Sequence, residues 1–234
     1  MRTVICMPTY NERENLPSLL EEIFATVEGV DVMVLDDNSP DGTGAAADGL
    51  AKKHKRLQVV HRPGKAGIAA AYADGFARAI EQGYDRIFQM DADYSHQPRY
   101  LPKLIEALDR ADMVIGSRYV EGGRVEQWSA PRRLLSRAGN TYANTLLGLP
   151  YRDATAGFCG YRRHVLEAIE LGSSTKDNHA FQVELKLRVH EKGFTIVEVP
   201  IVFWDRVVGA SKLPPRAALG SAMRILRLRI KGTD

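Results

Sequence analysis

The sequence has few of the residues that mark disulfide-stabilised, zinc-binding or nucleic-acid-binding proteins. Its 234 residues include only two cysteines, Cys6 and Cys159, and they do not form a CxxC pair. Cys6 lies in an apolar segment and is best explained as core packing, so nothing in the sequence requires a disulfide. The six histidines lack zinc-ligand spacing, and a formal net charge of +3 is too small to indicate a nucleic-acid partner.

Long apolar runs are also missing. No stretch approaches the roughly 20 apolar residues that a membrane-spanning helix needs. A strand-like pattern follows Met1 at once, without the pattern of a signal peptide. We therefore expect a protein of the reducing cytoplasm, either soluble or peripheral to a membrane. Repeats, low-complexity segments and linkers are absent too, so we expect a single domain over residues 1–234.

In the first half of the chain, short apolar runs alternate with segments of helical periodicity. The runs interpreted as strands are Val4–Met7, Val32–Leu35, Leu57–Val60, Ile87–Met90 and Met113–Ile115. The segments interpreted as helices are Leu16–Val27, Thr43–Lys53, Ile68–Gln82 and Tyr100–Arg110. This alternation is typical of βαβ units and predicts an α/β fold with a mostly parallel central sheet flanked by helices.

The pattern changes after Arg118. The elements expected there are a flexible loop at Glu121–Arg124, a helix at Leu134–Leu147, an extended segment at Ala156–Tyr161, a helix at Gln182–Glu191, a strand at Thr195–Phe203 and a helix at Ala217–Ile230. We expect the first half of the chain to bind one ligand and the second half to complete the site.

Asp91 and Asp93 stand where the fourth expected strand ends. Residues two apart on a strand share a face, so both carboxylates can converge at the carboxyl edge of the sheet. Open α/β sheets bind ligands at that edge. Two hard oxygen donors there suit Mg²⁺ or Mn²⁺ bridging to a diphosphate. A polar strand end followed by an ordinary turn explains the same residues without a metal.

Three other strand ends carry residues suited to a nucleotide. Pro8–Glu12 follows the first strand and opens a helix, where Tyr10 can stack on a base and Glu12 can bond to a ribose or base. Asp37 ends the second strand and can accept bonds from a nucleoside. Lys65 precedes a helix among glycines and suits contact with phosphate or nucleoside. Helix caps, turn residues and a solvated lysine explain these segments equally simply.

Two common nucleotide-binding motifs are not supported. Gly42–Ala47 matches the dinucleotide pattern GxGxx(G/A), but it follows the second expected strand rather than the first. The acid expected about twenty residues further on is replaced by Arg62. The segment Arg62–Gly67 is not a Walker loop, because the GK[ST] ending is missing.

Cations in the second half suit phosphate binding. Arg118 closes the fifth expected strand, and Arg132 and Ser136 are four residues apart on a helix, so they share a face. Arginine with a hydroxyl is a good phosphate clamp. An aromatic, basic loop nearer the C-terminus carries Arg206 and Lys212 and can fold over a bound diphosphate. A solvated basic face and a mobile loop with scattered charges are the alternatives.

Taken together, several segments resemble the family-2 glycosyltransferases of GT-A fold, and among them the dolichol-phosphate (polyprenol-phosphate) mannose synthases. The segments that carry the resemblance are Pro8–Glu12, Asp36–Thr43, Asp91–Asp93, Ser117–Gly123, Phe181–Glu184 and Asp205–Lys212. The first three are widespread in family 2, whereas the last three are narrower and favour the polyprenol-phosphate branch. In order along the chain, the resemblance spans residues 3–213.

The resemblance implies a reaction and a role for each site. The donor nucleotide sugar would be held by Pro8, Tyr10, Glu12, Asp37, Lys65, Arg206 and Lys212, with Mg²⁺ or Mn²⁺ on Asp91 and Asp93. The acceptor phosphate would be held by Arg118, Arg132 and Ser136, and Asp93 would lie nearest the chemistry. The sugar, in the commonest case mannose from GDP-mannose, would move onto a polyprenyl phosphate with inversion at C1.

The residues fit that reaction. A lipid phosphate is mostly dianionic near neutral pH because its second pKa is about 6, so it is already a nucleophile and needs no strong base. Cations must instead bring two anions together. The metal, Arg206 and Lys212 would stabilise the leaving diphosphate, and Arg118 with Arg132 would offset repulsion of the incoming phosphate.

Two positions depart from the family pattern. Ser95 stands where some relatives have a Gln metal ligand, which predicts looser coordination or coordination completed by water. Cys159 stands where relatives often have the Arg of a Ser-Gly-Phe-Arg segment. The sequence does not indicate what replaces that arginine.

The single domain would comprise a nucleotide-sugar-binding half (1–118), an acceptor half with a lid loop (119–213) and a basic amphipathic helix (214–234). On a helical wheel an apolar stripe of Leu219, Met223, Leu226 and Ile230 is flanked by Arg216, Arg224, Arg227 and Lys231. Such a helix suits an anionic bilayer, which predicts a peripheral protein at the cytoplasmic face of a membrane and leaves room for a membrane-spanning partner subunit. A stripe packed on the domain is an alternative of equal weight.

Three other functions compete with this one. A family-2 enzyme that passes its sugar to a non-lipid acceptor would need neither Arg132 with Ser136 nor a lipid-facing end. An enzyme that uses another nucleotide sugar, such as UDP-glucose, looks alike in sequence, and no residue decides between the two sugars. A sugar-nucleotide-forming nucleotidyltransferase would need a glycine- and lysine-rich first loop, which is missing here. A non-catalytic nucleotide-binding subunit would have no need for Asp91 and Asp93.

Overall fold

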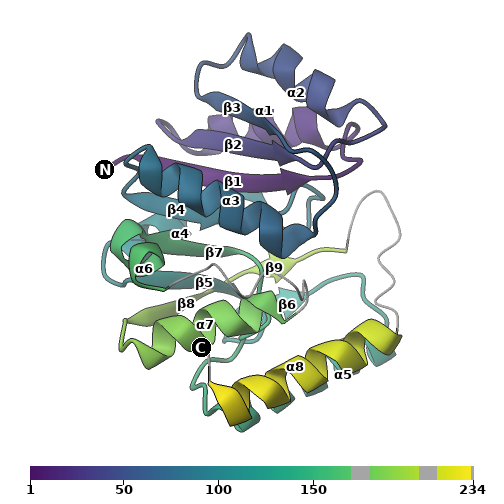
Figure 1. The fold of residues 1–234 in the computed structure, drawn as a ribbon, viewed down its shortest axis with the longest axis vertical. Coiled ribbons are helices and arrows are strands. Elements are labelled where there is room, and N and C mark those ends of the chain that lie inside the picture. The colour runs from purple at the N-terminus through teal and green to yellow at the C-terminus, as the bar shows by residue number, and fades with distance from the viewer. Residues whose placement is uncertain (170–179, 206–214, 233–234) are drawn as a thin grey trace.

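A seven-stranded sheet runs through the middle of the molecule, with helices on both faces (Figure 1). The computed structural model describes residues 1–169, 180–205 and 215–232, and the side chains of all of these except 215–219 and 231. The strands of the main sheet are β1 Thr3–Thr9, β2 Asp31–Asp36, β3 Leu57–His61, β4 Arg86–Gln89, β5 Met113–Ser117, β7 Cys159–Arg162 and β8 Ile196–Pro200. Two short strands, β6 Arg124–Val125 and β9 Val202–Phe203, pair with each other.

Helices connect most of these strands. They are α1 Leu16–Thr26, α2 Thr43–Ala51, α3 Ile68–Glu81, α4 Leu101–Leu108, α5 Ala130–Leu147, α6 Arg163–Ala168, α7 Phe181–Glu191 and α8 Pro215–Lys231, with a 3-10 turn at Pro98–Tyr100. No helix in the described ranges is both long and apolar enough to cross a bilayer.

Both faces of the sheet are buried, because successive strand side chains point to opposite sides. On β1, Val4 and Cys6 pack with α3, α6 and α7, whereas Ile5 and Met7 pack on the other face with α1, α2 and α4. Strands buried on both faces have continuous apolar sequences instead of alternating ones. Because the strands are buried on both faces, the short apolar runs in the sequence predicted their positions correctly.

The strand order places the topological switch point of the sheet beside β1. The order is β3-β2-β1-β4-β7-β5-β8, and every neighbouring pair is parallel except the two pairs that β7 makes. The chain runs outward from β1 to β3 and then crosses to β4 on the other side of β1. Open sheets bind ligands at such a switch point, outside the carboxyl ends of the strands. Since β7 is antiparallel, its first residues lie at this same edge.

The predicted fold is confirmed, with all five strands and four helices of the first half in place. The second half differs in detail. Thr195–Phe203, predicted as one strand, forms β8 and β9, which belong to different sheets. The break follows Pro200, where Ile201 donates its N–H to Ser117 of β5 and accepts from Arg124 of β6. Arg124 therefore begins a strand instead of ending a flexible loop, and the short helix α6 had no clear sequence signal.

The helices α5 and α8 lie side by side against α7, outside the two main helical layers (Figure 1). Ile225 and Leu228 of α8 are buried with Ala143 of α5 and Val183 of α7. The side that α8 packs on the domain is therefore not the stripe predicted from the helical wheel.

Two residues of the predicted α8 stripe are on the outside. Met223 is 47% exposed and Ile230 is 72% exposed, whereas Leu226 is half-buried. Arg224, predicted to flank the stripe, instead donates to the buried carboxylate of Glu184 on α7 at 3.0 Å. The side chains of Arg216, Leu219 and Lys231 lie outside the described residues. One face of α8 thus holds the helix on the domain, and Met223 and Ile230 face outward.

Gly160 tests the packing of the sheet. A Cβ atom at this position of β7 would lie 2.3 Å from the ring of Phe88 on the neighbouring strand β4. We expect Gly160→Ala to lower the free energy of unfolding by about 1–3 kcal/mol, measured by urea denaturation. Gly49→Ala in α2 is the control, since a Cβ there meets nothing within 4 Å. The control should be neutral or stabilising, and equal stability of both variants would contradict the packing described here.

Candidate active site

The carboxyl edge of the sheet gathers the residues that the sequence pointed to. Asp91 and Asp93 follow β4, and Arg118 follows β5. The segment 153–158 reaches the same edge because it leads into the antiparallel strand β7. The helix α5 contributes two more of the predicted side chains, and β9 ends two residues before Asp205.

A cavity of about 420 Å³ brings five predicted residues together, namely Asp91, Asp93, Arg118, Arg132 and Ser136. Its wall continues through Trp128, Phe203 and Asp205. The far end is lined by side chains of α5 and α8, among them Leu135, Tyr142, Ala222 and Ile225. The cavity therefore has a charged end at the sheet and a largely apolar end between two helices, a shape suited to a molecule with a charged head and an apolar chain.

Asp91 and Asp93 are each held by a hydroxyl group. The Tyr72 hydroxyl of α3 donates to Asp91 Oδ1 at 2.7 Å. Burial and the neighbouring Asp91 carboxylate raise the pKa of Tyr72 well above its usual range, so this hydroxyl keeps its proton and donates. Ser95 donates to Asp93 Oδ1 from its N–H at 3.1 Å and from its hydroxyl at 2.5 Å. Ser95 thus orients Asp93 from the position where a Gln ligand stands in some relatives.

His96 fixes the backbone of the same turn. Its Nδ1 accepts the N–H of Asp91 at 3.0 Å, and its ring stacks on Phe158 with centroids 5.0 Å apart. The side chains of Asp91 and Asp93 and the backbone of Asp91 are therefore all held by hydrogen bonds within the domain.

The carboxylate pair fits a divalent cation. In the described ranges, no point gathers three or more His, Cys, Asp or Glu side chains. A magnesium or manganese ion needs only one or two protein carboxylates when a diphosphate and water supply its other ligands. A carboxylate has about four acceptor positions, so the hydroxyl bonds from Tyr72 and Ser95 leave capacity for an ion. Asp91 and Asp93 are the residues that would hold it.

Arg118 is locked to Asp153 inside the domain. Its Nε and Nη2 donate to the two oxygens of Asp153 at 2.8 and 2.7 Å, and its backbone N–H donates to the same carboxylate at 3.0 Å. Arg118 Nη2 also donates to the Thr155 hydroxyl at 2.8 Å. Asp153 is fully buried. Within the described chain, Nη1 of Arg118 makes no hydrogen bond, so it can serve another anion at the cavity.

A second buried cation supports this pair. Lys186 of α7 is fully buried, and its Nζ donates to the carbonyl oxygen of Ala156 at 2.7 Å. Burial alone would raise the pKa of Asp153, but Arg118 and its hydrogen bonds outweigh burial and, with Lys186, hold that pKa below its usual range. Burial raises the pKa of the Cys159 thiol, and Lys186 opposes part of that rise. A cation from α7 thus lies beside Cys159, where the family pattern has an arginine.

Arg132 and Ser136 lie on the same side of α5, as their spacing predicted. Arg132 forms an ion pair with Asp205 and lies over the ring of Trp128, 4.2 Å from its centroid. The Ser136 hydroxyl is 2.8 Å from the hydroxyl of Tyr119. An anion that binds Arg132 would therefore have to displace Asp205, whereas an anion at Nη1 of Arg118 would leave the pairing with Asp153 in place.

The predicted nucleoside residues lie further along the same edge, at the ends of β1, β2 and β3. Lys65 Nζ stands 3.9 Å above the ring of Tyr10, and Glu12 accepts from the Asn15 side chain at 2.8 Å. Asp37 is paired with Arg62, the residue that argued against a dinucleotide motif. Pro8 lies in β1, which pairs with β4, the strand that precedes Asp91. Arg206 and Lys212 lie outside the described residues.

Three supporting residues were missed from the sequence. Tyr72 and Asp153 reach the site from distant segments, and no local spacing marks them. Lys186 lacked a clear signal as well, because polar and apolar residues alternate along Phe181–Glu191, and only the packing shows that α7 is buried on nearly all sides.

Comparison with known proteins assigns this arrangement to a family. Residues 4–170 match the profile described as "Glycosyl transferase family 2". The chain is 44% identical over 233 residues to the polyprenol monophosphomannose synthase of Mycolicibacterium smegmatis, covering 99% of this chain and 88% of that protein. It is 46% identical over 213 residues to the undecaprenyl-phosphate mannosyltransferase of Micrococcus luteus, covering 91% of this chain and 88% of that protein.

A solved structure shares the fold. The glucosyl-3-phosphoglycerate synthase of Mycobacterium tuberculosis, in complex with Mn²⁺, UDP-glucose and phosphoglyceric acid, superimposes with a TM-score of 0.68. The similarity covers 97% of this chain and 79% of that one, at 18% sequence identity. At this identity the likeness concerns the fold alone, and it agrees with the α/β architecture predicted from the sequence.

The Arg118–Asp153 pair yields a stability prediction. Asp153→Asn leaves Arg118 buried without its countercharge, so we expect a loss of about 3–5 kcal/mol in the free energy of unfolding at pH 7, measured by urea denaturation. The exposed Asp48→Asn is the control and should cost less than about 1 kcal/mol.

The same pair predicts a pH dependence. Because the folded-state pKa of Asp153 is lowered, the contribution of its charge to stability is complete above about pH 4 and is lost as the pH falls further. The difference in free energy of unfolding between wild type and Asp153→Asn should therefore become smaller as the pH falls below about 4. A difference that stays constant with pH would refute the ionic role.

Proposed function

The chain belongs to glycosyl transferase family 2, and we propose that it moves mannose from a nucleotide sugar, GDP-mannose, onto the phosphate of a polyprenyl lipid. The names of the two mannosyltransferase relatives support this choice of sugar and acceptor. The site supports it independently, because one cavity has a charged end at Asp91 and Asp93 for a phosphate and an apolar end between α5 and α8 for a lipid chain.

One observation carries the proposal. The carboxylate pair Asp91/Asp93, the cations Arg118 and Arg132 and the apolar end between α5 and α8 all line one cavity. An enzyme for a small soluble acceptor has no use for an apolar exit between helices. A polyprenyl phosphate matches both ends of the cavity, because its phosphate must reach the sugar at the charged end while its chain stays out of water at the apolar end.

On the donor side, the nucleoside would lie over Pro8, Tyr10, Glu12 and Asp37. A base that stacks on Tyr10 would displace Lys65 from the ring, which would place the Lys65 ammonium beside the donor phosphates. The diphosphate would approach Asp91 and Asp93 at the end of β4. When bound there, a Mg²⁺ or Mn²⁺ ion would neutralise charge on the leaving diphosphate.

On the acceptor side, Arg118, Arg132 and the Ser136 hydroxyl would hold the lipid phosphate. One phosphate oxygen would attack C1 of the sugar as the bond from C1 to the diphosphate breaks, so the configuration at C1 inverts. Arg118 costs little to reorganise because Asp153 already fixes its guanidinium. Arg132 would leave Asp205 for the phosphate, which couples acceptor binding to the residue that precedes Arg206 in the sequence.

The outer residues of α5 and α8 would place the protein on a membrane. Leu134 and Leu135 of α5 are 71% and 60% exposed, and Met223 and Ile230 of α8 are exposed as well. These four residues, the outer apolar face, lie on the two helices that form the apolar end of the cavity. An acceptor that stays in the cytoplasmic leaflet could then enter without leaving the bilayer. This placement is peripheral and is compatible with a membrane-spanning partner subunit.

The carboxylate pair tests the donor side. Asp91→Asn and Asp93→Asn should each lower mannosyl transfer about a thousandfold while the fold is kept, because leaving-group stabilisation is worth several kcal/mol. Chelation with EDTA should abolish transfer by the wild type, and Mn²⁺ or Mg²⁺ should restore it. Asp85→Asn, at the other end of the same strand, is the control and should remain active. Near-normal turnover by Asp91→Asn would overturn the metal assignment.

Arg132 tests the acceptor side. Arg132→Ala should raise KM for the lipid phosphate by roughly ten- to a hundredfold, since a charge-assisted bond contributes about 1.5–3 kcal/mol. Calorimetric titration should show unchanged affinity for the nucleotide sugar. The neighbouring Arg133→Ala is a matched control, because Arg133 donates to the Trp128 carbonyl at 2.6 Å and does not line the cavity. An equal loss of donor affinity in Arg132→Ala would mean that donor and acceptor sites are wrongly divided.

The outer apolar face yields a third test. The double variant Met223→Ser/Ile230→Ser removes exposed apolar groups and keeps the buried Ile225 and Leu228, so the fold should be unaffected. We expect the variant to bind liposomes about tenfold more weakly in a sedimentation assay and to lose a similar factor in transfer to long-chain polyprenyl phosphate. Transfer to a short, water-soluble analogue should hardly change. Val197→Ser, 36% exposed on the edge strand β8, is the control. Equal losses on both acceptors would show that these residues are structural.

A further inference from the structure

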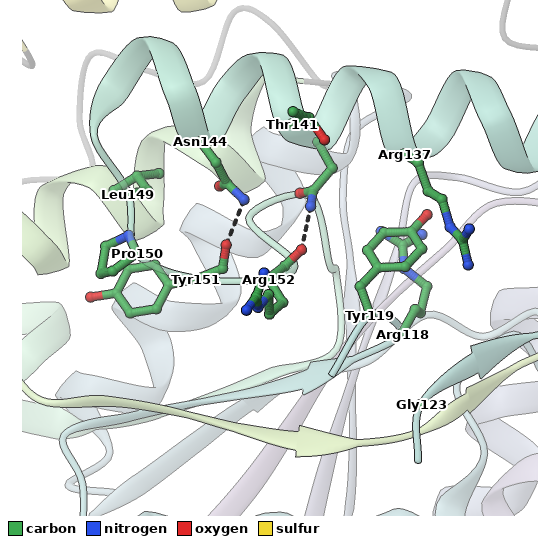
Figure 2. A pocket seen from close by; sticks show the side chains of 11 residues that line it. Arg118, Tyr119, Gly123, Arg137, Thr141, Asn144, Leu149, Pro150, Tyr151 and Arg152 are labelled. Carbon is green, nitrogen blue, oxygen red and sulfur yellow. Dashed lines mark hydrogen bonds between the residues drawn. The ribbon is translucent and has the colours of Figure 1, made fainter. Parts of the chain in front are cut away.

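A second cavity, of about 520 Å³, lies on another side of α5 (Figure 2). The helix lines it with Arg137, Asn140, Thr141 and Asn144, whereas the acceptor cavity takes Arg132, Leu135, Ser136, Gly139 and Tyr142 from the same helix. Each set follows the three- and four-residue spacing of one helical side. Arg118 lines both cavities, and nothing assigned to the proposed reaction otherwise uses the second one.

The wall opposite α5 is the segment Leu149–Arg152. Side-chain amides of α5 hold it in place, because Asn140 donates to the carbonyl of Arg152 and Asn144 donates to the carbonyl of Tyr151. Figure 2 shows both bonds, with the segment stretched below the helix. The cavity is therefore a built part of the fold, with walls tied to each other across it.

The lining is basic. It contains Arg118, Arg137 and Arg152 and no carboxylate. Arg118 is neutralised by Asp153, but neither Arg137 nor Arg152 forms an ion pair with any residue in the described ranges. The nearby Glu198 accepts the backbone N–H groups of Arg152 and Asp153 at 2.8 and 3.0 Å. Two guanidinium groups with neutral hydrogen-bonding groups between them suit a phosphate ester, since arginine binds phosphate through paired donors.

The position of the cavity favours a lipid phosphate over a soluble one. Leu134, Arg137 and Thr141 are three and four residues apart, so they form one row along α5. Leu134 belongs to the outer apolar face and is 71% exposed. Arg137, the next residue of the row, already lines the cavity. An arginine beside an apolar membrane-facing residue lays its stem along the apolar region and holds its charge at headgroup level.

We propose that this cavity binds the phosphodiester headgroup of an anionic membrane lipid other than the acceptor, held by Arg137 and Arg152. The inference rests on the proposed function only in placing α5 at a membrane. It adds a reason why the lipid would matter for transfer. Tyr119 lines the second cavity and its hydroxyl is 2.8 Å from that of Ser136, so a bound headgroup would steady the acceptor side of α5.

The test compares two variants that lose the same charge. Arg137→Gln/Arg152→Gln removes the two cations of the cavity, and Lys52→Gln/Lys53→Gln removes two exposed cations after α2. Binding is measured by flotation with phosphatidylcholine vesicles containing phosphatidylglycerol. We expect the arginine variant to bind at least about tenfold more weakly than wild type and the lysine variant to bind nearly as wild type, because each cation held at a headgroup contributes about fivefold. Equal losses in the two variants would overturn the proposal, leaving only general attraction to an anionic surface.

A second arm separates lipid from soluble phosphate. Calorimetric titration with inorganic phosphate and with glycerol 3-phosphate at millimolar concentrations should give the same result for wild type and for Arg137→Gln/Arg152→Gln, since any binding at the acceptor site does not use these two arginines. Binding of either one that is lost in Arg137→Gln/Arg152→Gln would show that the cavity takes a soluble phosphate and would refute the membrane lipid as its ligand. Circular dichroism and melting temperature of the arginine variant should match wild type, since neither side chain is buried.

The two proposals fail separately. Transfer from GDP-mannose to a short, water-soluble polyprenyl phosphate needs no vesicle, and the arginine variant should retain it within about twofold. Absence of this transfer in wild type would count against the proposed function and leave the vesicle result standing. Transfer to long-chain acceptor in vesicles should rise with phosphatidylglycerol in wild type and not in the arginine variant. The same rise in both would overturn the link between this cavity and the acceptor side.

Discussion

The buried pair of Arg118 and Asp153 is the interaction on which the site depends. It joins the end of β5 to the segment that enters β7, and it does so where water cannot screen either charge. Removing a charge from water costs several kcal/mol unless a partner and hydrogen bonds compensate. Here three bonds from Arg118, one from Thr155 and the nearby Lys186 supply that compensation. The result is a guanidinium whose orientation is fixed before an anion arrives.

That fixed guanidinium lines two cavities of opposite charge character. One cavity continues to the carboxylates of Asp91 and Asp93, where negative charge must be met by a cation, and the other is lined by Arg137 and Arg152. Both are walled by α5, a helix anchored through Asn140, Asn144 and the apolar cluster with α7 and α8. A reaction that joins two anions needs such an arrangement, because the fixed charges offset repulsion without reorganising at the moment of reaction.

The sequence predicted those parts of the site that depend on local periodicity. Arg132 and Ser136 share a helix face, so their meeting followed from a spacing of four residues. Asp91 and Asp93 also line one cavity, but they do so from the turn after β4, which ends at Gln89, and not from a shared strand face as their spacing predicted. Arg118 and Asp153 are 35 residues apart, and they meet because β7 runs antiparallel between two parallel strands. A pattern of alternating strands and helices contains no sign of that reversal. The C-terminal helix was predictable as a helix, but two of its sides carry apolar residues, and only packing shows that Ile225 and Leu228 face the domain.

One assay tests the central claim, that a mannosyl group and a lipid phosphate meet in the cavity beside Asp91. The protein would be incubated with polyprenyl phosphate, Mn²⁺ and each of several nucleotide sugars labelled in the sugar, including GDP-mannose and UDP-glucose, and the products would be partitioned between water and organic solvent. We expect label in the organic phase from GDP-mannose alone, and we expect mild acid to release it as mannose. Label that stays in the aqueous phase, or an organic product that forms from UDP-glucose instead, would contradict it.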